Sequence, residues 1–227
     1  MTQQYTILFD LDGTLVDTAP DLMRAHNHVM RKFGYPTKST EEIRNLVGQG
    51  AGAMLGRSIW GQAKKEFGKV QDEKIKKEMV NDFVEFYGKN IVNESTLIKG
   101  VKEFLIWCKK QKISMAVCTN KQEHLAIDLL KKIGIYDFFE YVAGHNTFEY
   151  CKPDPRHLIS VVEILGGDIK KTLMIGDSET DANAAKNAGM PIILLEDGYT
   201  EKNTTEIYHN HLVKDFIGIE KIVLKYL

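Results

Sequence analysis

The sequence contains little cysteine, little proline and almost no net charge. Its 227 residues include 3 cysteines and 5 prolines, and 30 basic side chains offset 31 acidic ones to give a formal net charge of −1. Three cysteines without metal-site spacing argue against a disulfide scaffold and fit a reducing, cytoplasmic setting. The near-zero charge creates no overall field that attracts nucleic acid or an anionic membrane, so neither is expected as a partner.

Long hydrophobic runs are also absent. The longest, such as PIILL at 191–195, are far too short to cross a bilayer, and the start of the chain, MTQQYTILFD, lacks the pattern of a signal peptide. A hydrophobic share of 43% and a charged share of 27% are typical of a soluble globular protein. The length suffices for one domain of ordinary size plus a smaller one.

Alternating strand and helix patterns indicate the fold class. Apolar, partly β-branched runs predict strands at Tyr5–Phe9, Ile113–Cys118, Tyr141–Ala143, Thr172–Ile175 and Pro191–Leu195. Helical patterns lie around the later strands, at Val101–Gln111, Glu123–Ile133, Pro155–Leu165 and Glu179–Ala188. Gly134 and Gly189 stand where helix C-caps belong. The alternation predicts an α/β fold, with a Rossmann-like parallel sheet covered by helices on both faces.

A long helical stretch separates the first two strands. Thr18 to about Thr96 shows no convincing strand and has amphipathic helical patterns at Pro20–Phe33, Thr40–Leu46, Ala51–Trp60 and Glu73–Asn90. Because a crossover between parallel strands needs only one helix, this stretch predicts an inserted α-helical subdomain. The segment Gly198–His211 is polar and is expected to be irregular.

Two pairs of acidic residues follow predicted strands. Asp10 and Asp12 leave the first strand two residues apart, and side chains at that spacing in an extended chain point the same way. Asp177 and Asp181 follow the fourth strand, in IGDSETD. Because ligands bind at the carboxyl ends of parallel strands, we expect these carboxylates to meet there. Their mutual repulsion calls for a cation, and oxygen donors favour Mg²⁺.

Groups that suit a phosphoryl group stand between the two acidic pairs. Thr119 and Asn120 follow the second strand, and Lys152 follows the third, in CKPDP. A hydroxyl, amide donors, a lysine and a metal ion all suit non-bridging phosphoryl oxygens. One carboxylate then remains as a nucleophile. The combination favours phosphoryl transfer through an aspartyl phosphate.

In this order the motifs resemble those of the haloacid dehalogenase superfamily of phosphohydrolases. They are DLDGT at 10–14, the threonine after the second strand, the lysine after the third, and GDSETD at 176–181. Within the superfamily the chain is most similar to the phosphoglycolate phosphatase group, in DTAPDLMRAHNHVMRKFGYP at 17–36, LVGQGAGAML at 46–55 and DGYTEKN at 197–203. The resemblance covers essentially the whole chain. It implies an α/β core at 1–16 and 97–227 and a helical cap at 17–96, with hinges near Val16–Asp17 and Leu97–Gly100.

The resemblance also implies a role for each candidate residue. Asp10 would attack phosphorus in line, and Asp12 would protonate the leaving oxygen and then deprotonate the attacking water. Mg²⁺ would be bound by Asp10, the Asp12 carbonyl and Asp177, and the phosphoryl oxygens by Thr119, the Asn120 amide and Lys152. Asp181 would position Lys152 or a metal-bound water. An acid at position 12 favours phosphate esters, because relatives that attack carbon do not need it.

We therefore expect a Mg²⁺-dependent phosphatase for a small phosphorylated metabolite, with 2-phosphoglycolate the leading candidate by resemblance. Alternatives are a phosphatase for another small ester, such as a sugar phosphate, and a phosphosugar mutase that passes the phosphoryl group to a hydroxyl. Two further classes stay open. A receiver-like domain would store phospho-Asp10 as a signal, and a non-catalytic relative would only bind a ligand. The sequence leaves the oligomeric state undetermined.

Several other features have ordinary structural explanations. The cap glycines Gly48, Gly50 and Gly52 suit a turn between helices as well as a substrate cradle. Arg44 and Arg57 suit contact with a substrate carboxylate, but the favoured expectation for both is a solvated helix face, as it is for the lysine-rich EKIKKE at 73–78. Histidines spaced by two, at 26/28 and 209/211, are not expected to hold a metal.

Overall fold

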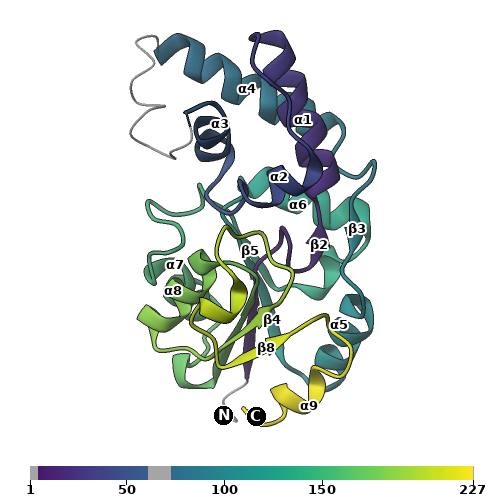
Figure 1. Cartoon of the computed structure of the whole chain (residues 1–227). Coiled ribbons are helices and arrows are strands. Elements are labelled where there is room, and N and C mark those ends of the chain that lie inside the picture. Colours follow the sequence, from purple (N-terminus) through teal and green to yellow (C-terminus); the bar gives the residue numbers. More distant parts are fainter. Residues whose placement is uncertain (1–4, 61–72, 227) are drawn as a thin grey trace.

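The computed structural model describes residues 5–60 and 73–226, so residues 61–72 of the predicted cap lie outside the described chain. Within it, six strands form one parallel sheet in the order β5–β4–β1–β6–β7–β8 (Figure 1). The strands are β1 (Thr6–Phe9), β4 (Ser114–Cys118), β5 (Tyr141–Ala143), β6 (Thr172–Gly176), β7 (Ile192–Leu195) and β8 (His211–Val213). The predicted α/β fold is confirmed.

Strand β1 lies at the centre of the sheet. It pairs with β4 on one side and with β6 on the other, so the strand order reverses at β1. In open parallel sheets, ligands bind outside the carboxyl ends of the strands where this reversal occurs. Asp10 follows the last residue of β1 directly and therefore lies at this point.

Helices cover both faces of the sheet because successive apolar residues of β1 point to opposite sides. Ile7 and Phe9 belong to one apolar core, and Leu8 belongs to the other. The first core includes residues of α5 (Val101–Lys110), α6 (Glu123–Ile133) and α9 (Glu220–Val223). The second includes residues of α7 (Arg156–Ile164) and α8 (Glu179–Ala188). Figure 1 shows these helices flanking the sheet, and all of them except α9 were predicted from the sequence.

A separate helical layer lies over one end of the sheet (Figure 1). In the described chain it contains α1 (Ala19–Lys32), α2 (Thr40–Arg44), α3 (Ala51–Trp60) and α4 (Glu73–Lys89). The chain enters it through β2 (Val16–Asp17) and leaves it through β3 (Thr96–Leu97). These two strands pair antiparallel, Val16 with Leu97 and Asp17 with Thr96, so the entry and exit points lie side by side.

Two details differ from the sequence prediction. The β2–β3 ladder was not predicted, because two residues per strand give no detectable alternation. The sheet also has β8, which begins at the last residue of the Gly198–His211 segment expected to be irregular. It pairs with β7 at the edge of the sheet. Gly134 and Gly189 do end α6 and α8, with φ of 81° and 72° respectively.

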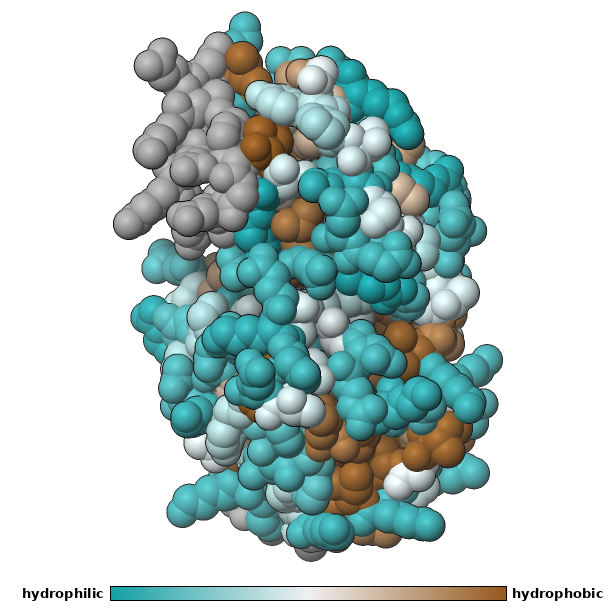
Figure 2. Space-filling view, in the orientation of Figure 1, coloured by the Kyte–Doolittle hydropathy of each residue, from teal (hydrophilic) through white to brown (hydrophobic). Residues whose placement is uncertain are grey.

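The visible surface is mainly hydrophilic. Figure 2 shows apolar atoms gathered near α5 and α9, where the exposed large side chains include Ile106, Ile217 and Leu224. In the described part of the chain, every helix is too short or too polar to cross a membrane.

Candidate active site

The two acids that follow β1 have different partners. Asp10 is buried, and its Oδ1 lies 2.9 Å from Lys152 Nζ. Asp12 accepts hydrogen bonds from Lys121 Nζ at 2.7 and 2.8 Å and from Thr18 Oγ1 at 2.7 Å. Both carboxylates nevertheless border the same cavity, as their spacing in the sequence predicts.

The second acidic pair is fixed by the start of α8. Ser178 and Asp181 form a capping box, in which the Asp181 Oδ2 accepts from the backbone N–H and hydroxyl of Ser178. The other Asp181 oxygen accepts from Lys152 Nζ at 2.6 Å. Both oxygens of Asp181 therefore already have partners within the protein.

Asp177 lies against the turn that follows β1. Its Oδ1 accepts from Thr14 Oγ1 at 3.1 Å, and its Oδ2 accepts from the Tyr199 backbone N–H at 2.7 Å. Gly13 allows this approach, because it adopts a φ of +81° and an added Cβ would lie 2.1 Å from Asp177 Oδ2. The DLDGT motif thus brings the end of β1 against the acid that follows β6.

The site concentrates negative charge away from water. Three carboxylate oxygens, one each from Asp10, Asp177 and Asp181, lie within 4.8 Å of one another. Burial, opposed by Lys152, raises the pKa of Asp10 to about 6. Burial, together with Asp181 and Asp10, raises the pKa of Asp177 well above its ordinary range. Burial would lower the pKa of Lys152, but the two carboxylates it contacts raise it instead.

These groups fit a hard divalent cation. Three buried carboxylates face the single ammonium of Lys152, and their oxygens are the donor type that Mg²⁺ prefers. Asp10 and Asp177, the two side chains predicted as ligands, both belong to this group, while Asp181 joins it to Lys152 and to the start of α8. The side chain of Asp12 lies outside this group of three, and the role of its carbonyl as a ligand stays a prediction.

The predicted phosphate-binding residues line the same cavity. Thr119 Oγ1 accepts from the Lys121 backbone N–H at 3.2 Å, so it also caps the turn before α6. The Asn120 side chain donates at 2.9 Å to the carbonyls of Gly48 and Lys152. It thereby joins the loop before α3 to the loop after β5. The described structure brings all the predicted site residues to one edge of the sheet.

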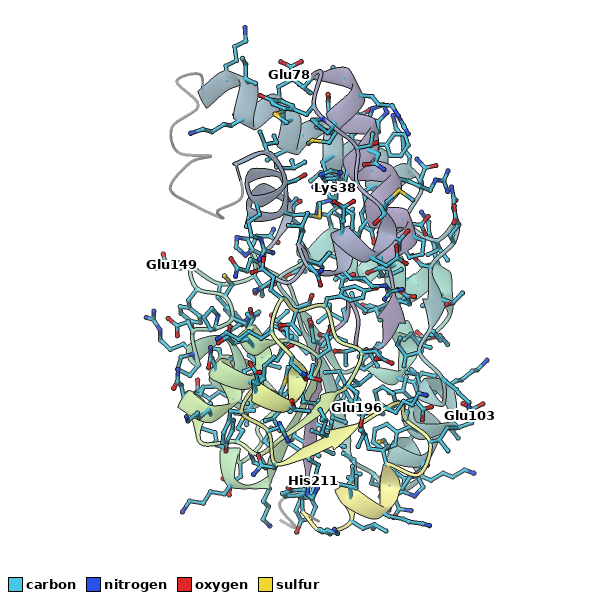
Figure 3. The ribbon with its side chains drawn as sticks, viewed as in Figure 1. Lys38, Glu78, Glu103, Glu149, Glu196 and His211 are labelled. Atoms are coloured by element: carbon cyan, nitrogen blue, oxygen red, sulfur yellow. The ribbon has the colours of Figure 1, made fainter. Side chains whose placement is uncertain are left out.

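The cavity lies between the sheet and the helical layer and has a volume of about 1250 Å³. Its floor includes Asp10, Asp12 and Lys152, and its helical wall is largely apolar, with Met54, Phe83 and other side chains. In Figure 3, Lys38 and Glu78 mark the helical layer, and Glu149 lies near the level where this layer meets the sheet. A small polar molecule bound at the floor would be covered by apolar surface.

Comparison with known proteins places the chain in a family. Residues 7–195 match the model of the haloacid dehalogenase-like hydrolase family. The chain belongs to this family. A phosphoglycolate phosphatase of Caulobacter vibrioides is 37% identical over 222 residues, covering 98% of this chain and 92% of that protein.

Solved structures agree with this assignment. A crystal structure described as a predicted phosphoglycolate phosphatase from Haemophilus somnus has a TM-score of 0.87 at 32% identity and covers 98% of this hydrolase and 99% of that chain. β-Phosphoglucomutase from Clostridium difficile has a TM-score of 0.78 at 22% identity, covering 98% and 97%, which shows a shared fold alone. This haloacid dehalogenase-like hydrolase is a phosphoric monoester hydrolase. Phosphatases of the family generally use a divalent metal ion, typically Mg²⁺.

Several site residues of the hydrolase were missed in the sequence. Lys121 pairs with Asp12, and the ring of Tyr87 lies 4.6 Å below the Lys121 ammonium. Tyr199 donates its hydroxyl to Asp17 and its backbone N–H to Asp177. The available signals were the position of Lys121 directly after Thr119-Asn120 and the Gly-Tyr pair in DGYTEKN. Neither signal specifies a contact partner, because each contact joins distant parts of the chain.

Three basic side chains of the predicted solvated helix faces differ from that prediction. Arg44 does not face only solvent, since its guanidinium donates to Asp17 at 2.6 Å. The side chain of Arg57 is only 10% exposed, and it donates to the carbonyls of Leu46 and Val47. Within EKIKKE, Lys74, Ile75, Lys77 and Glu78 are exposed as predicted, but Lys76 is buried and borders the cavity. At Arg57 and Lys76, packing between the helical layer and its surroundings removes a long cationic side chain from water.

Proposed function

We propose that this chain is a Mg²⁺-dependent phosphatase that hydrolyses 2-phosphoglycolate through a phosphoryl group carried on Asp10. The observation that carries the proposal is the buried Asp10 carboxylate, which lies beside Lys152 and Asp177 at the floor of the cavity between the sheet and the helical layer. The names of the relatives at 37% and 32% identity support the choice of substrate.

Asp10 is the nucleophile in this proposal. One carboxylate oxygen attacks phosphorus, the bond to the leaving oxygen breaks, and an aspartyl phosphate forms. Lys152 Nζ, held between Asp10 and Asp181, stabilises the charge that develops on the phosphoryl oxygens. Because the side-chain N–H groups of Asn120 bond two carbonyls, its backbone N–H is the amide that would contact the phosphoryl group, together with Thr119 Oγ1.

Asp12 supplies the proton transfers. It donates a proton to the leaving oxygen, and it then removes a proton from the water that attacks the aspartyl phosphate. Its carboxylate is oriented by Thr18 and Lys121, so it borders the cavity without joining the group formed by Asp10, Asp177 and Asp181. This separation gives Asp10 and Asp12 different chemical tasks although they are two residues apart.

Asp10, Asp177 and the Asp12 carbonyl would hold Mg²⁺. When bound, the ion supplies positive charge that offsets the buried carboxylates and the incoming phosphoryl group. The raised pKa values of Asp10 and Asp177 support this assignment, since they indicate that the ionised carboxylates lack sufficient compensation from Lys152 alone.

Residues 17–96 act as the cap in this proposal, and residues 1–16 and 97–227 form the catalytic core. The cavity between the two layers supports this division. The β2–β3 ladder supports it too, because β2 leads the chain into the helical layer and β3 leads it out. Closure of the cap would exclude bulk water from the phosphoryl group and bring apolar side chains over the substrate.

A substrate comparison with purified protein tests the proposal. Phosphate release is measured for 2-phosphoglycolate, glucose 6-phosphate and glucose 1-phosphate, each with Mg²⁺ and with EDTA. We expect Mg²⁺-dependent hydrolysis with the highest kcat/KM for 2-phosphoglycolate, and a loss of more than about 10³-fold in Asp10→Asn. Asp128→Asn, on the outer side of α6, is the matched control and should keep its activity.

Other outcomes would favour the alternatives. Appreciable isomerisation of glucose 1-phosphate would indicate a mutase. A stable phosphorylated Asp10 with negligible turnover, detected by mass spectrometry, would indicate a receiver-like role. Hydrolysis that persists in Asp10→Asn would rule out the aspartyl-phosphate route.

A further inference from the structure

Phosphate esters of 2-hydroxy acids place two charged groups close together. In such a substrate one carbon separates the leaving oxygen from the carboxylate. The group that protonates the leaving oxygen must therefore lie beside the substrate's carboxylate. Under the proposed function that group is Asp12, which becomes a carboxylate when it gives up its proton, so a cation next to Asp12 offsets its repulsion of the substrate's carboxylate.

Lys121 is the cation in that position. Its Nζ lies 2.7 Å from Asp12 Oδ1, its side chain is only 5% exposed, and it borders the cavity. A lysine ammonium carries three N–H donors, and Asp12 accepts two hydrogen bonds from it. The third donor remains to bridge to a second carboxylate.

Tyr87 supplies an independent observation. This residue of α4 is 1% exposed, borders the cavity, and has a hydroxyl without a hydrogen-bond partner among the described residues. A buried hydroxyl without a partner is costly, so a ligand acceptor at this place would be stabilised. Its ring lies 4.6 Å from Lys121 Nζ, which puts a hydroxyl donor and an ammonium at the same end of the cavity.

The other lysines that border the cavity are placed differently. Lys152 is held between Asp10 and Asp181 and serves the phosphoryl group. Lys76 and Lys77 lie on α4, ten or more residues before Tyr87, which corresponds to about 15 Å along the helix. That separation is too large for a carboxylate one carbon away from the leaving oxygen.

We propose that Lys121 and the Tyr87 hydroxyl form a carboxylate-binding subsite that selects phosphate esters of 2-hydroxy acids. The selecting cation thus comes from the loop after β4, and the cap contributes a neutral hydroxyl. This inference rests on the proposed function for the position of the leaving oxygen. It adds the residues that distinguish a phosphate ester with a carboxylate from one without.

The test compares two esters that differ only at this group, 2-phosphoglycolate and 2-hydroxyethyl phosphate. The measured quantity is the ratio of their kcat/KM values, which cancels any general effect of Lys121 on Asp12. We expect Lys121→Met to lower this ratio about 10- to 100-fold and Tyr87→Phe to lower it about 3- to 10-fold. Lys121→Arg should keep most of the preference because it keeps the charge. Lys77→Met, in the same cavity, should leave the ratio unchanged.

A binding measurement separates this inference from the proposed function. Both esters are titrated calorimetrically into Asp10→Asn, and into Asp10→Asn combined with Lys121→Met. Tighter binding of the carboxylated ester that disappears in the double variant supports the subsite, even if the wild-type chain hydrolyses neither ester. A ratio of kcat/KM unchanged within twofold in both Lys121→Met and Tyr87→Phe, or equal binding of the two esters to Asp10→Asn, would overturn it.

Discussion

Gly13 brings the backbone of the turn after β1 close to the proposed metal ligand Asp177. An added Cβ would lie 2.1 Å from Asp177 Oδ2, at a φ of +81°. We expect Gly13→Ala to displace Asp177, to lower the free energy of unfolding by about 2–4 kcal/mol and to reduce kcat/KM at least about 100-fold. Urea unfolding and phosphate-release assays measure the two effects.

Gly134 provides a matched control for that substitution. It has the same φ of +81°, but no atom lies within 4 Å of an added Cβ. Gly134→Ala should therefore cost only about 1 kcal/mol of backbone strain and leave activity intact. Equal effects of the two substitutions would show that strain alone, and not displacement of Asp177, accounts for the loss.

His157 gives the folded chain a defined sensitivity to acid. It is fully buried on α7, neither ring nitrogen has a partner among the described residues, and burial lowers its pKa to about 3. The pKa of histidine in the unfolded chain is about 6.5. At pH values between this pKa and the folded pKa of about 3, only the unfolded chain takes up the proton. Stability contributed by neutral His157 is thus complete above this range and is lost as the pH falls.

We expect His157→Leu to flatten the acid side of the stability profile. Below pH ~6, the free energy of unfolding should decrease less steeply with falling pH in the variant than in the wild type. The two slopes should differ by about 1 kcal/mol per pH unit. Urea unfolding at a series of pH values provides the measurement, and the two proteins should differ little in slope above pH ~7. Parallel slopes throughout would mean that His157 is protonated in the folded chain.

At the scale of elements, the start of α1 depends on a distant tyrosine. Thr18 does not cap the helix, because its hydroxyl donates to Asp12. The Tyr199 hydroxyl instead accepts from the Ala19 backbone N–H at 2.8 Å and donates to Asp17. Asp17 also pairs with Arg44, so α1, α2 and the loop after β7 meet at the end of β2.

Tyr199→Phe should loosen this junction. We expect faster hydrogen exchange of amides in the first turn of α1 and a loss of about 1–2 kcal/mol of stability, as for removal of a helix cap. Hydrogen-exchange mass spectrometry localises the change. Tyr208→Phe, at a tyrosine that is 40% exposed, is the control and should alter neither quantity. Unchanged protection of α1 in Tyr199→Phe would show that the hydroxyl does not hold the helix start.

The elements that the sequence predicted are those with strong local patterns. The central strands are short apolar runs flanked by helices, and Gly134 and Gly189 end their helices where a left-handed residue is required. Strand β8 was missed because three residues, all half-buried, give no alternation. It exists through pairing with β7, which is a tertiary contact.

The candidate site shows the same division. Asp10, Thr119 and Asp177 could be predicted together because each directly follows a strand, and parallel strands end at one edge. The contacts of Lys121 and Tyr87 could not, because they depend on how α4 packs over the loop after β4. Sequence spacing therefore predicted which residues meet at the floor of the cavity, but it did not predict the contacts that depend on the helical layer.

At the scale of the whole molecule, the cluster of buried carboxylates should couple stability to Mg²⁺. An ion that binds only the folded chain adds RT ln(1 + [Mg²⁺]/Kd), or about 2.7 kcal/mol at 100 times Kd. For a chain of this size we expect a rise in Tm of about 5–10 °C between EDTA and saturating Mg²⁺. Differential scanning calorimetry provides the measurement.

The same experiment on variants identifies the ligands. Asp177→Asn should lose most of the Mg²⁺-dependent rise in Tm, whereas Asp128→Asn, exposed on α6 beside Lys132, should retain it. An undiminished rise in Asp177→Asn would place the ion elsewhere in the molecule.

The β2–β3 ladder has a practical consequence. Because Asp17 and Thr96 are paired neighbours, both ends of the helical insertion meet at a single place on the sheet layer. A foreign segment of different length can therefore be spliced between them without stretching any connection between sheet strands. Protein engineers can therefore test for new substrate preferences by exchanging one continuous stretch of the gene, while the proposed nucleophile Asp10 and the proposed phosphate-binding Lys152 stay as they are.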